Sequence, residues 1–190
     1  MGNRTALSLV TLMALSSLQA ADSVFTIEPS SSQVSFTLQA TAHEVHGTFE
    51  VASGEVRFDP LSGSASGSIV VSATSGDTAN RKRDKKMHHV VLRSSEHPRI
   101  VFRPVSFSGS FDPAVGGELQ ISGTLQLLGI DHPIELPVEV AVDGDALRVQ
   151  ASLTVPYVEW GLHDPSFFVL RVGKTVAVEI DLDGRLVTDP

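Results

Sequence analysis

The chain of 190 residues contains no cysteine, one tryptophan and one tyrosine, and aromatic residues make up only 6% of it. Without cysteine the protein has no thiol nucleophile, no zinc ribbon and no iron–sulfur cluster, and its domain must be stable without disulfides. The scarcity of aromatic side chains argues against a stacking platform for bases or sugars. These absences exclude several classes of enzyme and of nucleic-acid-binding protein.

The charge balance and the missing motifs narrow the function further. Acidic residues outnumber Lys and Arg by 22 to 14, so the net charge of −8 disfavours general binding to nucleic acid. There is no Gly-x-Ser-x-Gly elbow, P-loop or dinucleotide fingerprint. His43 and His46 lie at a strand entry, where alternation directs them to opposite faces, so no metal site is expected. We therefore predict a protein that is not an enzyme and has no cofactor.

The first twenty residues are typical of an export signal. Arg4 precedes an apolar run from Ala6 to Leu18, and Ala20 offers a small residue at a cleavage site. The run is shorter than a membrane-spanning helix. We predict a signal peptide at residues 1–20, a mature domain at residues 22–187 and a periplasmic or secreted location; a retained N-terminal anchor is the alternative.

From Ser23 onward, apolar and polar residues alternate with a period of two, which predicts β-strands. The Asp143-Gly144-Asp145 turn between two alternating runs is a hairpin signal. Gly63 to Gly67 is expected to be a loop, and Pro104 is expected to break a strand. The clearest apolar faces are Val34, Phe36 and Leu38; Ile134, Leu136, Val138, Val140 and Val142; Leu147, Val149, Ala151, Leu153 and Val155; and Val176, Val178, Ile180 and Leu182.

One segment departs from the alternation. Residues 78–93 lack Gly and Pro and are rich in helix formers, so we predict one α-helix there, capped by Asp77 or Thr78. About eight strands with one apolar face each cannot be covered by a single helix, so the sheet must cover itself. Long strands joined by neighbouring turns favour an all-β, eight-stranded antiparallel barrel of lipocalin type over the alternative, a two-sheet sandwich.

The inward positions of such a barrel are mainly branched aliphatic residues, which leave room along the axis. A cavity of this kind has few directional groups and suits a long hydrocarbon; a core filled by its own side chains is the alternative. The predicted lumen residues are Phe36, Leu38, Phe49, Val71, Met87, Phe102, Leu125, Val138, Val140, Leu153 and Val178.

The chain resembles the YceI-like lipid- or polyisoprenoid-binding family over about Val24 to Val187. Each matching segment is weak evidence for the family by itself, but the segments occur together in the right order with the right gaps. They are Phe25–Pro29 with Val34–Phe36, His46–Phe49, Gly54–Pro60, Thr78–Met87, Pro98–Phe102, Ser122–Gly129, Pro133–Pro137 and Trp160–Leu162. The resemblance implies an extended lipocalin-like barrel, outside the cytoplasm, that encloses a long isoprenoid chain such as a polyprenyl diphosphate or a quinone tail.

A basic stretch from Arg81 to Lys86 stands out in this acidic chain. It is either a site for an anionic headgroup at the barrel mouth, with transient membrane contact, or a solvated helix face. Arg83 and Asp84 match the family motif and are expected to tie the helix to the barrel, whereas Lys86-Met87 replaces the His-Leu of many members. The candidate headgroup or rim residues are Arg81, Arg83, Lys86, His46 and His88.

Two functions follow from these features. The first is an exported protein that holds a long isoprenoid lipid, of polyprenyl phosphate or quinone type, and binds no nucleic acid. The second is a structural or stress-response module of the cell envelope without a bound lipid. The oligomeric state is left open by the sequence.

Overall fold

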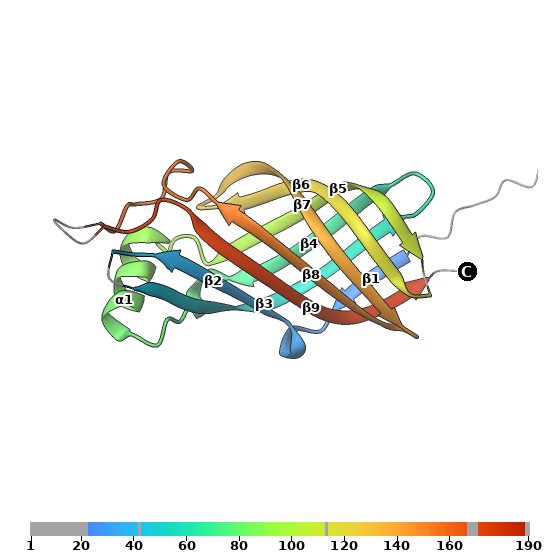
Figure 1. Ribbon diagram of the computed structural model, residues 1–190, viewed down its shortest axis with the longest axis horizontal. Helices are drawn as coiled ribbons and strands as arrows, with labels where there is room; N and C mark the ends of the chain where they lie inside the picture. The colour runs from blue at the N-terminus through green and yellow to red at the C-terminus, as the bar shows by residue number, and fades with distance from the viewer. Residues whose placement is uncertain (1–22, 42, 113, 167–170, 189–190) are drawn as a thin grey trace, which may run out of the picture.

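The computed structural model describes residues 23–41, 43–112, 114–166 and 171–188 and shows a long barrel (Figure 1). The predicted signal peptide, residues 1–20, lies outside the described residues. Strands make up most of the fold, as the alternation predicted. They are β1 (Ser23–Ile27), β2 (Gln33–Gln39), β3 (Glu44–Asp59), β4 (Ser64–Ser72), β5 (Arg99–Asp112), β6 (Gly116–Leu127), β7 (Ile130–Asp143), β8 (Ala146–Val155) and β9 (Val176–Thr188).

These nine strands form eight positions around a closed antiparallel barrel, because β1 and β2 share one position between β3 and β9. Every other strand pairs with its neighbours in sequence, and β3 with β4 closes the circle. The predicted eight-stranded barrel is therefore confirmed and the sandwich is excluded. The closed form follows from the apolar faces, which have only each other to cover them.

The junction between β1 and β2 is a single 3₁₀ turn at Pro29–Ser31. Pro29 lacks an amide N–H and cannot continue the ladder. Hydrogen bonds to Asp183 of β9 bridge the gap: Glu28 N donates to Asp183 O at 2.8 Å, and Asp183 N donates to Ser32 Oγ at 3.0 Å. The sheet thus stays closed through the break.

The helical segment lies at one end of the barrel (Figure 1). It consists of α1 (Arg81–Lys86), the only α-helix in the described part of the chain, followed by a π-helical turn at Met87–Val91. The predicted helix is confirmed, but its cap is not: Asn80, rather than Asp77 or Thr78, accepts hydrogen bonds from the amides of Lys82 and Arg83.

Two local predictions were wrong. Residues 64–67 belong to β4, so the turn between β3 and β4 comprises residues 60–63, of which Gly63 has a φ of +69°. Pro104 does not end a strand, because β5 continues through it to a β-bulge at Val105. A bulge tolerates proline since the ladder is already interrupted there, and Val105 is left 61% exposed.

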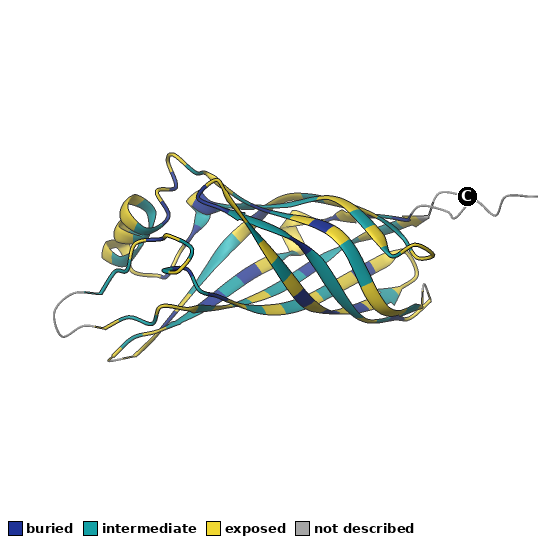
Figure 2. Cartoon of the chain, turned by 90° about the horizontal axis from the view of Figure 1, so that it is seen from above, coloured by how far each residue is buried: buried dark blue, intermediate teal, exposed yellow. Residues whose placement is uncertain are grey.

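The core divides into two apolar clusters along the barrel axis. Buried residues recur along the strands between the two ends of the barrel (Figure 2). The larger cluster fills the end away from α1 and includes Phe25, Leu147 and Leu182, which are 4%, 4% and 2% exposed. The smaller one lies at the α1 end and includes Leu92, Tyr157 and other side chains from the connecting loops. The two ends of the barrel therefore differ: one is packed by strand residues and the other is covered by loops.

Candidate functional site

The barrel encloses a cavity of about 270 Å³ whose wall is almost entirely apolar. Among the described residues that line it, only Lys86 and Tyr157 carry a polar side-chain group. A group buried in this cavity would find apolar contacts and few hydrogen-bond partners, which favours hydrocarbon. The wall comprises Val34, Phe36, Leu38, Phe49, Ile69, Val71, Met87, Val91, Leu92, Ile100, Phe102, Ile121, Leu125, Leu127, Ile134, Leu136, Val138, Val149, Ala151, Leu153, Val155, Leu162, Pro165, Val176, Val178, Ile180 and Leu182.

The structure places ten of the eleven predicted lumen residues on this wall; their contact with a ligand stays a prediction. Those ten are Phe36, Leu38, Phe49, Val71, Met87, Phe102, Leu125, Val138, Leu153 and Val178. Val140 does not line the cavity, contrary to the sequence prediction. It is 7% exposed and packs in the larger apolar cluster, although Val149, opposite it on β8, lines the cavity.

Residues from two segments close the mouth of the cavity. Lys86 and Met87 come from the helical segment, and Leu162 and Pro165 come from the loop after β8. Lys86 Nζ donates a hydrogen bond to Pro165 O at 2.7 Å, which joins the two segments. Because Lys86 is exposed and also borders the cavity, its ammonium lies between the apolar interior and water.

Tyr157 lies on the inner side of the same loop and is 5% exposed. Its hydroxyl donates to Gly173 O at 2.6 Å, so the one phenol of the protein is already engaged. Burial, with a smaller contribution from the negative charge of Asp164, raises the pKa of Tyr157 to about 12. The folded protein therefore favours the neutral phenol.

We expect the tyrosinate absorbance of the folded protein to appear near pH 12 rather than near pH 10. Because the folded-state pKa is raised, the associated stability is fully present below about pH 10 and is lost as the pH rises towards 12. An ultraviolet pH titration measures this directly, since Tyr157 is the only tyrosine. The urea-unfolded chain is the control, and a native transition near pH 10 would show that the hydroxyl is accessible to water.

The basic candidates on α1 have different surroundings. Arg83 donates to Thr78 through Nε and Nη2 at 2.8 and 2.7 Å, and Asp84 Oδ1 accepts from the amide of Thr78 at 3.0 Å. The two side chains therefore both bond to Thr78 and hold the loop before the helix. Arg81 is exposed in the first turn of α1. Of the three predicted basic residues, Lys86 alone borders the cavity.

The two candidate histidines do not line the cavity. His88 Nε2 lies 2.8 Å from Gly76 O and Nδ1 lies 3.0 Å from Ser94 Oγ, so both ring nitrogens fix the helical segment to nearby loops. Because a carbonyl oxygen only accepts, Nε2 carries a proton. His46 is exposed on β3 with its Nδ1 3.0 Å from Thr37 Oγ1. Neither position favours contact with a lumen ligand.

An aromatic stack lies beside the mouth. The β7–β8 ladder runs from Asp143 only as far as Val138, which is opposite Ala151. In the part of β7 beyond it, the indole ring of Trp160 stacks on His132 with ring centroids 4.1 Å apart and planes 5° apart. His132 Nε2 is buried there without a hydrogen-bond partner. Trp160 thus packs on the part of β7 that no longer pairs with β8.

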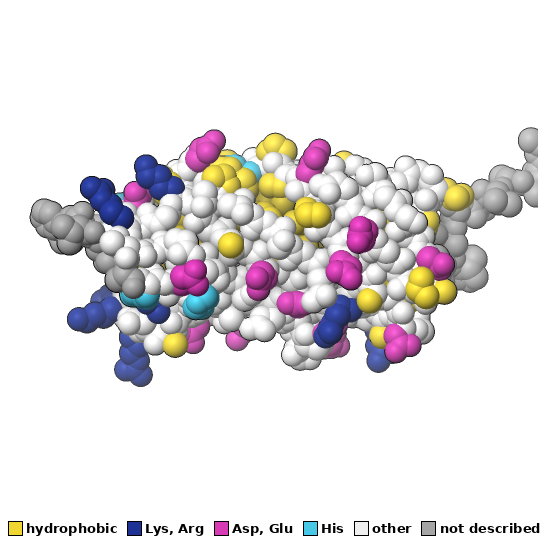
Figure 3. All heavy atoms as spheres, in the orientation of Figure 1, with side chains coloured by type: hydrophobic (Ala, Val, Ile, Leu, Met, Phe, Trp, Pro, Cys, Tyr) yellow, Lys and Arg dark blue, Asp and Glu magenta, His cyan; other side chains and the backbone are white. Residues whose placement is uncertain are grey.

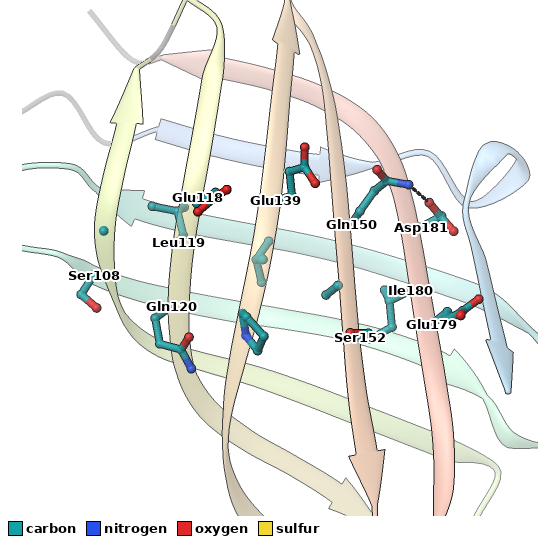
Figure 4. Close-up of a pocket in the computed structure, with 14 residues that line it drawn as sticks. Ser108, Glu118, Leu119, Gln120, Glu139, Gln150, Ser152, Glu179, Ile180 and Asp181 are labelled. Atoms are coloured by element: carbon teal, nitrogen blue, oxygen red, sulfur yellow. Dashed lines mark hydrogen bonds between the residues drawn. The ribbon is translucent and has the colours of Figure 1, made fainter. Parts of the chain in front are cut away.

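A second hollow, of about 680 Å³, lies on the outer face of β5–β9 (Figure 4). Its outward side chains are polar, and Gln150 donates to Asp181 across β8 and β9. Glu118 and Glu139 lie opposite each other on β6 and β7. This hollow is a solvent-facing surface with excess negative charge and differs in character from the lumen.

A family model described as a YceI-like domain matches residues 25–184 of the chain, that is, nearly all of the barrel. The chain belongs to the YceI-like family. Curated relatives agree: Protein YceI of Salmonella newport (strain SL254) is 30% identical over 115 residues, and Protein YceI of Escherichia coli O157:H7 is 29% identical over 115 residues. Each alignment covers 59% of this chain and only 58% of the relative's length.

Solved structures of this family share the fold. BcnA of Burkholderia cenocepacia has a TM-score of 0.68 at 17% identity, covering 83% of this chain and 98% of that protein. A polyisoprenoid-binding domain from Saccharophagus degradans, implicated in plant cell wall breakdown, has a TM-score of 0.66 at 18% identity, covering 85% and 97%. At these identities the likeness establishes the YceI-like barrel for this chain.

The described residues offer neither a metal cluster nor a membrane-spanning helix. Within the described ranges from residue 23 to 188, no three His, Cys, Asp or Glu side chains are placed to hold a metal ion. In the same ranges, no helix has the length and apolar character needed to cross a membrane.

The sequence predicted Lys86 and Met87 at the lumen or its rim, but it did not predict the mouth residues from the loop after β8. Tyr157, Leu162 and Pro165 follow β8 in a segment without regular alternation, so no periodicity marked them. The available signal was composition, because the only tyrosine and the only tryptophan of the chain lie within four residues of each other, at 157 and 160.

Proposed function

We propose that this protein is an exported lipid-binding protein that holds the hydrocarbon tail of an isoprenoid in its barrel. The apolar cavity supports this function, because nothing on its wall except the Lys86 ammonium and the engaged Tyr157 hydroxyl is polar. Each buried CH₂ contributes about 0.8 kcal/mol before the costs of binding are subtracted. The S. degradans neighbour, described as polyisoprenoid-binding, makes an isoprenoid the favoured hydrocarbon.

The headgroup of the lipid is placed at the mouth beside Lys86. The ammonium already bonds a neutral carbonyl, Pro165 O, and a phosphate oxygen or a quinone carbonyl is a partner of the same kind. Most of the Lys and Arg side chains seen on the face in Figure 3 gather at the end of the barrel that carries α1, whereas acidic side chains are spread along its wall. This distribution favours an anionic headgroup over a cationic one.

The location outside the cytoplasm is proposed from residues 1–20 alone, whose basic start, apolar run and Ala20 are typical of a signal peptide. Expression of the full chain in a bacterial host, followed by cell fractionation and N-terminal sequencing, tests it. A periplasmic or secreted product that begins near Ala21 supports export. A cytoplasmic product that begins at Met1 contradicts it.

Lipid extraction from the purified full chain, followed by mass spectrometry, tests the function itself. We expect an isoprenoid to co-purify and to be displaced by an added prenyl phosphate. A protein that yields no lipid and takes up no fluorescent prenyl probe would instead be a module of the envelope without a ligand.

The role of Lys86 gives a sharper prediction. Lys86→Met keeps an apolar stem of similar length and removes the charge, so the affinity for a prenyl phosphate is expected to fall about fivefold, or about 1 kcal/mol. The affinity for the uncharged prenyl alcohol with the same tail should not change. Lys85→Met is the matched control, because Lys85 is exposed on α1 and does not line the cavity. Equal losses for both lipids would show that Lys86 contributes to closure and not to headgroup binding.

A further inference from the structure

The helical segment at the mouth, residues 81–93, presents two different faces. On its inner face, Met87 and Val91 line the cavity, and Arg83 is bonded to Thr78. These side chains are four residues apart, as expected for one side of a helix. Apart from Lys86, which borders the cavity, the exposed side chains of the segment form its outer face and include no carboxylate: Arg81, Lys82, Lys85, His89, Val90 and Arg93.

The cations on the outer face of α1 have no anionic partner in the protein. Within the described ranges, Arg81, Lys82 and Lys85 form no ion pair. The only carboxylate of α1, on Asp84, is bonded to the loop before the helix instead. Arg81 and Lys85 are four residues apart, as are Lys82 and Lys86, and like charges at this spacing destabilise a helix. An external anion would relieve this repulsion.

The arginines along the barrel wall have different surroundings. Four of them lie 2.8–3.7 Å from a carboxylate oxygen: Arg57 with Glu55, Arg103 with Asp131, Arg148 with Asp183, and Arg185 with Asp145. In the helical segment only Arg93 has such a partner, Glu96, at the longer distance of 3.8 Å. Uncompensated positive charge is therefore concentrated at the mouth of an otherwise acidic protein.

An anionic lipid surface is the partner whose chemistry fits this outer face. Each Lys or Arg side chain close to such a surface strengthens binding about fivefold. Val90, which is 42% exposed among the cations, provides an apolar side chain for the membrane interface. A nucleic acid or an acidic protein would match the charge, but would use neither the exposed valine nor the apolar cavity that opens beside it.

The distribution of charge also determines how the barrel would be oriented. Acidic side chains are spread along the wall, whereas Lys and Arg side chains gather at the α1 end (Figure 3). Strand β3 alone has 16 residues and spans about 50 Å, several times the Debye length of about 8–10 Å. The distant acidic side chains are therefore screened when the α1 end faces an anionic membrane, and that end is attracted.

We propose that the outer face of residues 81–93 docks the protein on anionic membranes, with the mouth of the barrel towards the bilayer. This inference goes beyond the proposed function, because it concerns where a lipid is taken up or released and not what the lumen holds. Met87 and Val91 join the docking segment directly to the cavity. A hydrocarbon tail could thus pass between bilayer and lumen with little exposure to water, which is unfavourable for it.

Flotation with lipid vesicles tests the docking, using the protein purified after expression of the full chain. At about 0.05 M salt, we expect binding to phosphatidylcholine vesicles with about one third phosphatidylglycerol to exceed binding to pure phosphatidylcholine about tenfold or more. At about 0.5 M salt this preference is expected to disappear, because the Debye length becomes shorter than the reach of the side chains. Equal binding to both kinds of vesicle at low salt would overturn the proposal.

A pair of charge reversals tests the residues. Lys82→Glu together with Lys85→Glu is expected to weaken binding to the anionic vesicles about twentyfold or more. The matched control is Arg57→Glu with Arg185→Glu, which changes the net charge equally at side chains that are 56% and 75% exposed on β3 and β9. Neither lysine lines the cavity, so the affinity for a prenyl alcohol in solution should not change. Circular dichroism verifies the fold of both variants.

The absence of cysteine allows the orientation to be measured with single labels. A polarity-sensitive dye on Val90→Cys is expected to shift its emission to shorter wavelength when anionic vesicles are added. The same dye on Leu61→Cys is the control, because Leu61 is 73% exposed in the turn between β3 and β4, at the other end of the barrel. These labels also test the proposal if the charge-reversed pair does not fold.

The outcomes are distinct. Anionic vesicle binding that is lost only in the lysine pair, with a dye response only at residue 90, supports the docking face. Equal losses in the two charge-reversed pairs, or a dye response at residue 61 instead, overturn it. Retention on heparin without flotation overturns it in favour of a soluble polyanion. Each of these failures leaves the proposed lipid binding intact, because prenyl alcohol binding in solution is measured separately.

Discussion

Replacement of Ala151 by phenylalanine is expected to reduce the affinity for any isoprenoid about tenfold or more while the barrel stays folded. Ala151 is the smallest side chain on the cavity wall, and it lies between Val138 and Ile180 on the neighbouring strands. The added phenyl ring brings six carbons into a cavity of about 270 Å³. Because the ring fills a void, the usual cost of overpacking, about 1–3 kcal/mol, is reduced.

The matched control for this variant is Ala177→Phe. Ala177 is exposed on the outer face of β9, so the same change adds a ring without entering the lumen. Uptake of a fluorescent prenyl probe measures the affinity, and circular dichroism with thermal unfolding verifies the fold of both variants. Unchanged uptake by Ala151→Phe would place the lipid outside the barrel.

The largest expected loss of stability is at the packed end of the barrel. Leu147 is 4% exposed and lies between Val142 of β7 and Gly184 of β9. Leu147→Ala removes buried methyl groups and leaves a cavity, so the free energy of unfolding is expected to fall by about 2–5 kcal/mol. For a chain of this size, that corresponds to a decrease in Tm of about 2–4 °C for each kcal/mol.

Leu61→Ala is the control, because Leu61 is 73% exposed in the turn between β3 and β4. Its effect is expected to stay within about 0.5 kcal/mol. Urea unfolding curves of both variants measure the difference. A loss below about 1 kcal/mol for Leu147→Ala would mean that this end is loosely packed.

Much of the fold could be predicted from local patterns. Alternation in β6 to β9 identifies the strands and their inward faces, since side chains of a strand point to opposite sides in turn. The Asp143-Gly144 turn fixes one hairpin, and Gly144 has the positive φ of +63° that such turns require. The helical segment was recognisable because it breaks the period of two.

The contents of the lumen could not be predicted in the same way. Val140 and Val138 are both valines on the inward face of β7, yet only Val138 lines the cavity. Their cross-strand partners differ in the opposite sense: Leu119, opposite Val138 on β6, does not line the cavity, whereas Val149, opposite Val140 on β8, does. The partners of His88 and Lys86 likewise lie in loops outside the helical segment.

The sequence by itself determined the strands and their apolar faces, and hence that the sheet must cover itself, because those faces must be buried and little else is available to cover them. The tertiary structure decided that the sheet closes as a barrel and not as a two-sheet sandwich. The tertiary structure alone decided how much of the interior is empty. That volume is the space left after side chains from all the strands have packed. It depends on how side chains from different strands fit against one another, which neither the alternation within a strand nor the composition of the chain specifies.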